Sequence, residues 1–181
     1  GAAHAATMLL LPGVAPDEIA LQTPAGLTFH LPVEQLRWED DAAVCTVRKD
    51  AGDDPDVTNG VRISAAVRRV ESGVSIEGGA GIGRVTRPGL SVPVGEAASN
   101  PAPRAQITAA VERVARETGY VGGFSVVISA ENGAELAKQT YNEHLGVVGG
   151  ISILGTSGVV EPMSEKALLD TIRLELDSRY A

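Results

Sequence analysis

The stretch VRISAAVRRV, residues 61–70, carries the clearest information about the fold. Its apolar side chains occupy alternate positions: Val61, Ile63, Ala65 and Val67. Because neighbouring side chains of a β-strand point to opposite faces, this spacing predicts a strand with one apolar face. The run AAVCTVRK, residues 42–49, alternates in a similar way. Together the two runs indicate an antiparallel sheet with one polar face.

Other strands and helices lie on both sides of this pair. The runs EIALQT and LTFHLPV flank the turn-like PAG and predict a hairpin. Apolar residues at helical spacing predict a helix over 103–120 and a last helix that opens at Ser164. Strands come mostly first and helices later, so we expect an α+β fold, a mainly antiparallel sheet with packed helices, in a single domain over residues 1–181.

Composition excludes several classes of function. The 181 residues are 44% hydrophobic but only 3% aromatic, so the core is expected to be aliphatic. A net charge of −8 argues against nucleic acid as the main partner. No apolar run approaches the roughly 18 residues that a membrane span needs. The single cysteine, Cys45, forms no internal disulfide and is interpreted as a small buried apolar residue, which is consistent with the cytoplasm.

The loop VRKDAGDDPDVTNG, residues 47–60, concentrates acidic side chains: Asp50, Asp53, Asp54 and Asp56. It is not an EF-hand, because a loop counted from Asp54 has Asn59 at position 6 and Ala65 at position 12. Two interpretations stay open. The aspartates form a turn by binding their own backbone, or they face a ligand and take part in proton transfer.

Two glycine-rich stretches resemble nucleotide motifs without matching them. GGAGIGRVT, residues 78–86, continues as a strand instead of opening a helix, which argues against a Rossmann turn and suggests a close approach of backbone or ligand. GGISILGTSG, residues 149–158, lacks the lysine of a P-loop. Its backbone N–H groups would still suit a carboxylate or another polar ligand. The three histidines have no metal-ligand spacing, so no protein-bound metal is expected.

Basic residues gather in and around these segments: Arg48, Lys49, Arg62, Arg68, Arg69, Arg84, Arg87 and Arg104. On an acidic protein, a local basic lining favours a polyanionic small molecule, because arginine binds carboxylates in a bidentate manner. The alternative is that they cover a solvated face of the sheet.

Four motifs occur in a fixed order: KDAGDDPDVTNG (49–60), GGAGIGRVTRPGL with VPVGE (78–96), NPAPR (100–104) and LGVVGGISILGTSGVVEPMS (145–164). In these motifs, over nearly the whole chain, the sequence resembles the CbiD family, the cobalt-precorrin-5B C1-methyltransferases of anaerobic cobalamin biosynthesis. That family opens with a Thr-Thr-Gly-x-Cys-Ala stretch and continues into a second, α/β domain. We therefore expect an N-terminal domain of a longer two-domain protein, with a shortened start.

The resemblance implies methyl transfer from S-adenosylmethionine to C1 of the cobalt-precorrin-5B macrocycle. The substrate is a cobalt tetrapyrrole edged with acetate and propionate carboxylates, so the metal belongs to the substrate. The alternative is a non-catalytic module that binds or assembles corrinoids. A third interpretation is an anion-binding domain unrelated to corrinoids.

The resemblance also suggests roles for residues in the motifs. One wall of the active-site cleft, with the catalytic acids, is assigned to Asp50, Asp53, Asp54 and Asp56. At least one of these acids is expected to face the ligand, and the others to hold the turn. Substrate binding is assigned to Lys49, Thr58, Arg84, Thr86, Asn100 and Arg104. Binding of the methyl donor is assigned to Gly149, Gly150, Gly155, Thr156, Ser157, Gly158, Glu161 and Ser164. We expect four motif segments to converge on one concave surface: residues 49–60, 78–86, 100–104 and 149–164.

Overall fold

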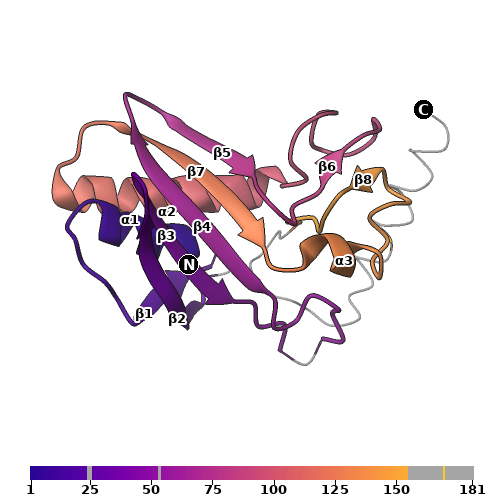
Figure 1. Cartoon of the computed structure of the whole chain (residues 1–181), viewed down its shortest axis with the longest axis horizontal. Helices are drawn as coiled ribbons and strands as arrows, with labels where there is room; N and C mark the ends of the chain where they lie inside the picture. The colour runs from indigo at the N-terminus through magenta and orange to yellow at the C-terminus, as the bar shows by residue number, and fades with distance from the viewer. Residues whose placement is uncertain (24–25, 53, 155–168, 170–181) are drawn as a thin grey trace.

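The structure, a computed structural model, describes residues 1–23, 26–52, 54–154 and 169. In these residues a six-stranded sheet has the order β1-β2-β3-β4-β7-β5, and a two-stranded sheet lies at one end (Figure 1). The large sheet consists of β1 (Glu18–Gln22), β2 (Thr28–Glu39), β3 (Ala42–Arg48), β4 (Arg62–Val70), β5 (Val74–Gly78) and β7 (Gly123–Ala130). The small sheet and the helices are β6 (Arg84–Val85), β8 (Val147–Val148), α1 (Ala2–Leu10), α2 (Pro101–Thr118) and α3 (Gly133–Ala137).

The expected α+β fold with a mainly antiparallel sheet is confirmed. The first four strands form an antiparallel meander, in which Cys45 lies opposite Ala65 and Ala43 opposite Val67. These four side chains are completely buried, as predicted, but Val44 and Thr46 on the other face of β3 are buried as well, so the expected polar face is absent along this strand. Burial raises the pKa of the Cys45 thiol to about 11, which fits a buried apolar role.

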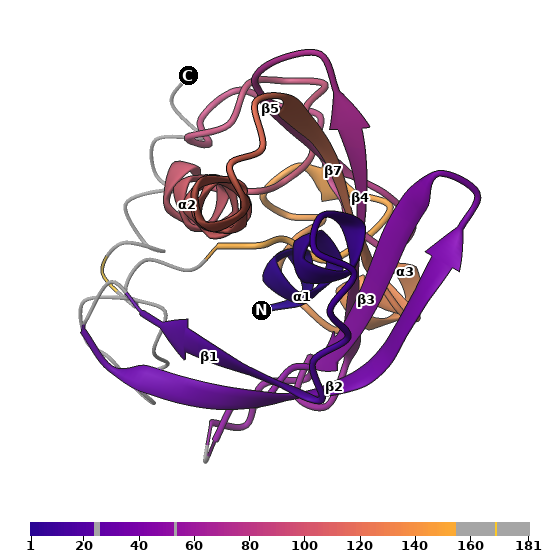
Figure 2. The same ribbon diagram turned by 90° about the vertical axis from the view of Figure 1, so that its left-hand side faces the viewer.

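One strand pair is parallel. Strand β5 pairs with β7, and the connection between them runs through β6 and α2. Parallel neighbours need a long crossover of this kind, usually with a helix. Both helices α1 and α2 lie on one face of the large sheet (Figure 2). Small side chains such as Ala5 and Ala6 let α1 approach β3 and β4 closely.

The small sheet joins the large one through a backbone crossing that only glycine permits. A Cβ atom added to Gly81 would lie 2.0 Å from the carbonyl oxygen of Ala130, and one added to Gly150 would lie 2.3 Å from that of Gly81. The close approach expected for the glycine-rich strand is therefore made by backbone.

Among the described residues, no helix is both long and apolar enough to cross a membrane. Apart from Leu169, the helix predicted from Ser164 lies outside the described residues.

Candidate functional site

Three of the four motif segments meet at one end of the large sheet, next to β6 and β8 (Figure 1). Backbone hydrogen bonds connect them: Gly83 donates to Ile151 at 2.9 Å, Ala98 donates to Gly83 at 2.7 Å, and Ile153 donates to Ala98 at 2.8 Å. The segments 78–86, 97–104 and 149–154 are thus held side by side although they are far apart in the sequence.

The fourth segment, the acidic loop, lies at the same end of the sheet. It connects β3 to β4, and the start of β4 neighbours the end of β7. There Glu131 donates a backbone hydrogen bond to Arg62, and Ala130 donates one to Ala80 in the glycine-rich segment. The expected single concave surface stays a prediction, because it includes residues outside the described ones.

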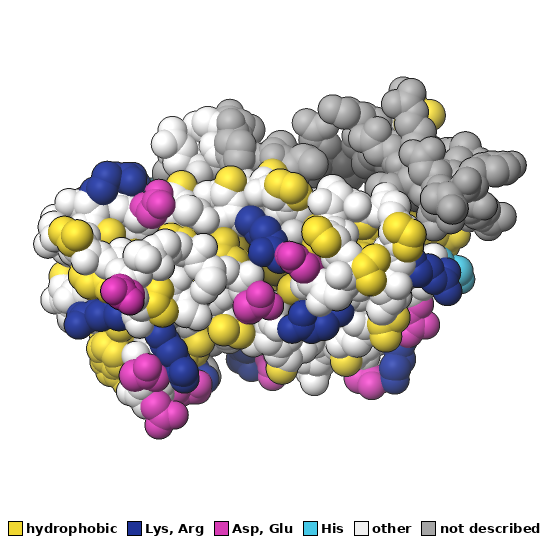
Figure 3. Space-filling view, turned by 90° about the horizontal axis from the view of Figure 1, so that it is seen from above, with side chains coloured by type: hydrophobic (Ala, Val, Ile, Leu, Met, Phe, Trp, Pro, Cys, Tyr) yellow, Lys and Arg dark blue, Asp and Glu magenta, His cyan; other side chains and the backbone are white. Residues whose placement is uncertain are grey.

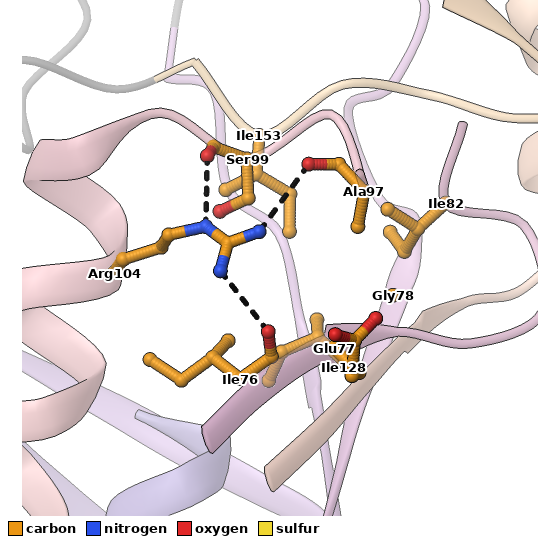
Figure 4. A pocket seen from close by; sticks show the side chains of 9 residues that line it. All are labelled: Ile76, Glu77, Gly78, Ile82, Ala97, Ser99, Arg104, Ile128 and Ile153. Atoms are coloured by element: carbon orange, nitrogen blue, oxygen red, sulfur yellow. Dashed lines mark hydrogen bonds between the residues drawn. The ribbon is translucent and has the colours of Figure 1, made fainter. Parts of the chain in front are cut away.

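Arg104 lies in the first turn of α2, within the helix predicted over 103–120 (Figure 4). Its guanidinium donates hydrogen bonds to the carbonyl oxygens of Ser99 and Ile76, both at 3.1 Å, and of Ala97 at 3.5 Å. The hollow around it is too narrow to admit a water molecule. Arg104 therefore connects α2 to the edge strand β5. Its assignment to substrate stays a prediction, with most of its donors already engaged.

The acidic loop is a tightly folded turn. Asp50 Oδ1 accepts a hydrogen bond from the Gly52 backbone at 2.8 Å, and Asn59 Oδ1 accepts one from Ala51 at 3.0 Å. Such local bonds are the reason that Asp and Asn favour turns. The Gly60 N–H donates to the Lys49 carbonyl at 2.9 Å and closes the loop at its base.

Three predicted site residues contact one another inside this loop. The Lys49 ammonium binds both Asp56 Oδ2 and Thr58 Oγ1, while Asp56 Oδ1 accepts two hydrogen bonds from Thr58 at 2.7 Å. Burial works to raise the pKa of Asp56, but the bonds from Lys49 and Thr58 outweigh it and hold that pKa below its usual value. Asp56 is therefore an ionised structural anchor and a poor proton acceptor.

Asp54 differs from its neighbours. In the described part of the chain its half-buried side chain makes no hydrogen bond or ion pair, although its backbone takes part in the turn. Asp53 lies outside the described residues. Of the predicted acids that the structure describes, Asp54 is the one whose carboxylate has no hydrogen-bond partner among the described residues.

Other predicted substrate residues are partly engaged by the protein. Arg84, on β6, donates to the Gly95 carbonyl at 3.0 Å, and Thr86 donates to that of Gly146 at 2.8 Å. Asn100, at the start of α2, accepts a hydrogen bond from Ser91 at 3.1 Å and donates one to the Leu154 carbonyl at 3.0 Å. Asn100 thus holds Leu154, which directly precedes Gly155, one of the residues assigned to binding of the methyl donor.

The residues assigned to the methyl donor are described only in part. Gly149 has open space around an added Cβ, whereas Gly150 packs against the backbone of Gly81. Gly155, Thr156, Ser157, Gly158, Glu161 and Ser164 lie outside the described residues. Ser99 forms a β-bridge with Ile153, just before this segment. Its hydroxyl is buried and, within the described residues, has no hydrogen-bond partner. No group of His, Cys, Asp or Glu in the described residues could hold a metal ion.

The structure also shows a charged cluster that the sequence does not reveal. Glu34 on β2 accepts hydrogen bonds from Arg48 at 2.6 Å and from Arg62 at 2.7 Å, and Arg62 lies 3.5 Å from Glu131. The bonds from Arg62 and Arg48 lower the pKa of Glu34. Two arginines of the predicted basic lining are therefore neutralised across three strands. Glu34 lies at an irregularity in the pairing of β2 with β3, between Val33 and Gln35, so a regular period-two pattern does not reveal the cluster.

Comparison with known proteins decides the family. The model of the CbiD family matches residues 1–162. The chain belongs to the CbiD family. Among CbiD relatives, "Cobalt-precorrin-5B C(1)-methyltransferase" of Ruminiclostridium cellulolyticum is 52% identical over 97% of this chain and 46% of that protein. The protein of the same name from Pseudomonas aeruginosa strain LESB58 is 48% identical over 96% of the chain and 48% of that protein.

A solved CbiD structure shares the fold. The crystal structure of the "cobalamin biosynthesis protein (cbiD)" of Archaeoglobus fulgidus matches with a TM-score of 0.64 and 32% identity, over 96% of this chain and 56% of that one. This chain spans about half the length of the curated CbiD relatives that it matches.

Proposed function

We propose that the protein containing this chain is a C-methyltransferase of cobalamin biosynthesis that acts on C1 of cobalt-precorrin-5B. The observation that carries the proposal is the identity of about half of all residues, over nearly the whole chain, with proteins named for that reaction. The motif segments that the fold gathers at one end of the sheet supply the site.

The donor in this proposal is S-adenosylmethionine, which supplies an electrophilic methyl group when bound. Methyl transfer depends strongly on how donor and acceptor are held, because alignment removes much of the entropic barrier. The described residues contribute a rigid frame for this purpose. Asn100 fixes Leu154, and the crossing of Gly81 with Gly150 fixes the strand that leads to it.

The substrate role follows from charge. A tetrapyrrole edged with carboxylates needs cations that the protein does not already neutralise. Arg84 is half exposed; it donates to the Gly95 carbonyl and lies 3.8 Å from the exposed carboxylate of Glu77, a weak surface ion pair that a substrate carboxylate can replace. Asp54 is the acid we propose to face the macrocycle, where a carboxylate can take a proton or steady positive charge. We place the activity in the cytoplasm, in keeping with the free thiol of Cys45.

The test uses the full-length protein, cobalt-precorrin-5B and S-adenosylmethionine with an isotopically labelled methyl group. We expect the label in the macrocycle, at C1 by NMR spectroscopy, and saturable binding of the donor in calorimetry. A corrinoid-binding module without catalysis would bind the macrocycle and leave the donor unbound. Binding of neither compound would indicate the third interpretation, an unrelated anion-binding domain.

A further inference from the structure

Arg87 stands apart from the other basic side chains of the described residues. Each of the other Lys and Arg side chains there makes a hydrogen bond or an ion pair with a described residue. Arg87 makes neither with any described residue, and it is exposed. On a protein with a net charge of −8, such a guanidinium is the group best able to take an external anion.

The aliphatic part of Arg87 is nevertheless held in place. It packs on Gly146, which has a φ of +78°, and a Cβ added there would lie 2.9 Å from both Cβ and Cγ of Arg87. The preceding residue, Thr86, is bound to the Gly146 carbonyl through both its N–H and its hydroxyl. The stem is therefore partly ordered before any ligand arrives, which lowers the entropic cost of binding.

The turn that ends at Gly146, residues 141–146, also carries two stacked aromatic rings. Tyr141 and His144 are stacked, with ring centroids 4.6 Å apart and an interplanar angle of 14°. Tyr141 is 47% exposed, in a chain where aromatic residues are scarce. Figure 3 shows a basic side chain next to a histidine on the surface at its right-hand end. A stacked pair that includes a half-exposed tyrosine suits a further planar group.

The turn is anchored to the glycine crossing. Asn142 is buried and donates from Nδ2 to the Gly150 carbonyl at 3.2 Å, while its Oδ1 accepts from Ser152 at 3.1 Å. The Val147 N–H donates to the Asn142 carbonyl at 2.8 Å. The aromatic pair and the Arg87 stem thus belong to one rigid element.

We propose that Arg87 and the Tyr141–His144 pair form a subsite for the edge of the macrocycle, where Arg87 binds a peripheral carboxylate and the rings contact the flat body. This inference deepens the proposed function and rests on it for the identity of the ligand. It adds three residues to those assigned from the motifs and gives Arg87 the role of a specificity-determining residue.

The test measures binding of two probes to the full-length protein by calorimetry: cobyrinic acid, a cobalt corrinoid with free carboxylates, and its methyl ester. We expect Arg87→Ala to weaken binding of the acid roughly ten- to hundredfold, the effect of losing a charged hydrogen bond, and to leave ester binding unchanged. Tyr141→Ala should weaken both probes by roughly three- to tenfold, because stacking does not depend on charge.

The matched control is Arg113→Ala, which removes an exposed arginine paired with Glu117 on α2 and should alter neither probe. A loss of acid binding in Arg87→Ala no greater than in Arg113→Ala overturns the subsite, as does failure of the wild type to bind the acid. If the wild type binds the acid through Arg87 but transfers no methyl group, the subsite stands and the proposed reaction fails. If Arg87→Ala transfers the methyl group with normal turnover and KM, the proposed reaction stands and the subsite fails.

Discussion

Lys49 and Asp56 form an ion pair within the loop that joins β3 to β4, and Thr58 binds both of them. The pair joins the first residue after β3 to the far side of the loop. It thereby sets the shape of the turn from which Asp54 projects. Two of the four aspartates, Asp50 and Asp56, hold the turn, as the sequence interpretation expected for some of them.

The first prediction concerns the strength and pH dependence of this pair. A double-mutant cycle of Lys49→Met and Asp56→Asn should give a coupling free energy of about 1 kcal/mol at pH 7, a value suited to a partly exposed pair. The pKa of Asp56 is lower in the folded state than in the unfolded chain. Its contribution to the free energy of unfolding is therefore complete above the pKa of the unfolded chain and is lost as the pH falls through the pKa of the folded state.

The coupling should therefore begin to fall below about pH 4, the pKa of an unfolded aspartate, and vanish below the lower pKa that Asp56 has in the folded state. Urea unfolding of the four proteins at pH 7 and at successively lower pH measures it. A coupling that persists unchanged where Asp56 is protonated would show that the contact is not electrostatic.

The second prediction concerns Arg104. Its replacement by Ala removes hydrogen bonds to the carbonyl groups of Ser99 and Ile76 and a longer one to that of Ala97, which keeps the Ser99 N–H at 2.7 Å, so the free energy of unfolding should fall by about 2–3 kcal/mol. Arg113→Ala on the same helix is the control, and its exposed ion pair should cost less than about 0.5 kcal/mol. Equal losses in the two variants would refute the connecting role of Arg104. Undiminished stability with weakened corrinoid binding would restore the substrate role.

The third prediction compares two glycines with positive φ. Gly81→Ala combines an unfavourable backbone conformation with a collision at 2.0 Å, whereas Gly95→Ala, at a φ of +91°, meets nothing within 4 Å. Gly95→Ala should cost about 1 kcal/mol and Gly81→Ala at least about 2 kcal/mol more. Thermal unfolding of both variants measures the difference. Similar melting temperatures would mean that the crossing relaxes freely.

The fourth prediction concerns catalysis. Asp54→Asn keeps the size of the side chain and removes its charge and basicity, so methyl transfer by the full-length protein should fall roughly a hundredfold. Asp40→Asn makes the same chemical change in the β2–β3 turn, at the opposite end of β3. Asp40 has a φ of 53°, which asparagine also tolerates, so Asp40→Asn should fold normally and retain activity. Unchanged turnover in Asp54→Asn would eliminate it as the acid that faces the macrocycle.

The strands are predictable from sequence where one face is buried and the pattern has period two. Cys45 and Ala65 show this, since each lies on the apolar face of its run and the two meet in the core. A period-two pattern does not predict which strand β5 pairs with. It depends on the helix that carries the chain from β5 across the sheet to β7, a contact between segments distant in sequence.

The grouping of the motif segments is easier to predict from sequence than the roles of single residues. Three of the segments lie side by side in the fold, but a sequence does not tell whether Arg104 meets a carboxylate of the substrate or the carbonyl of Ile76. Asn100 followed by Pro101 is a helix-start signal, and it would have moved the predicted start of this helix from Pro103 to Pro101. The predicted roles of the residues beyond Leu154 stay predictions.

The position of β7 has a consequence for folding. Strand β4 ends at Val70 and β5 begins at Val74, yet β7 lies between them, and Phe124 at its start donates to the Gly73 carbonyl at 2.8 Å. During synthesis β4 and β5 emerge well before β7, and a link this short favours a hairpin between them. The nascent chain must keep these two strands apart, or separate them again, before β7 can enter.

Insertion of β7 should therefore be the slow step of refolding, since it requires contacts between distant segments. Pulsed hydrogen exchange should show the amides of β2 and β3 protected before those of β7 and β5. Simultaneous protection of all six strands would contradict this order. The last strand to become ordered is then an interior one, and the sheet is completed from within.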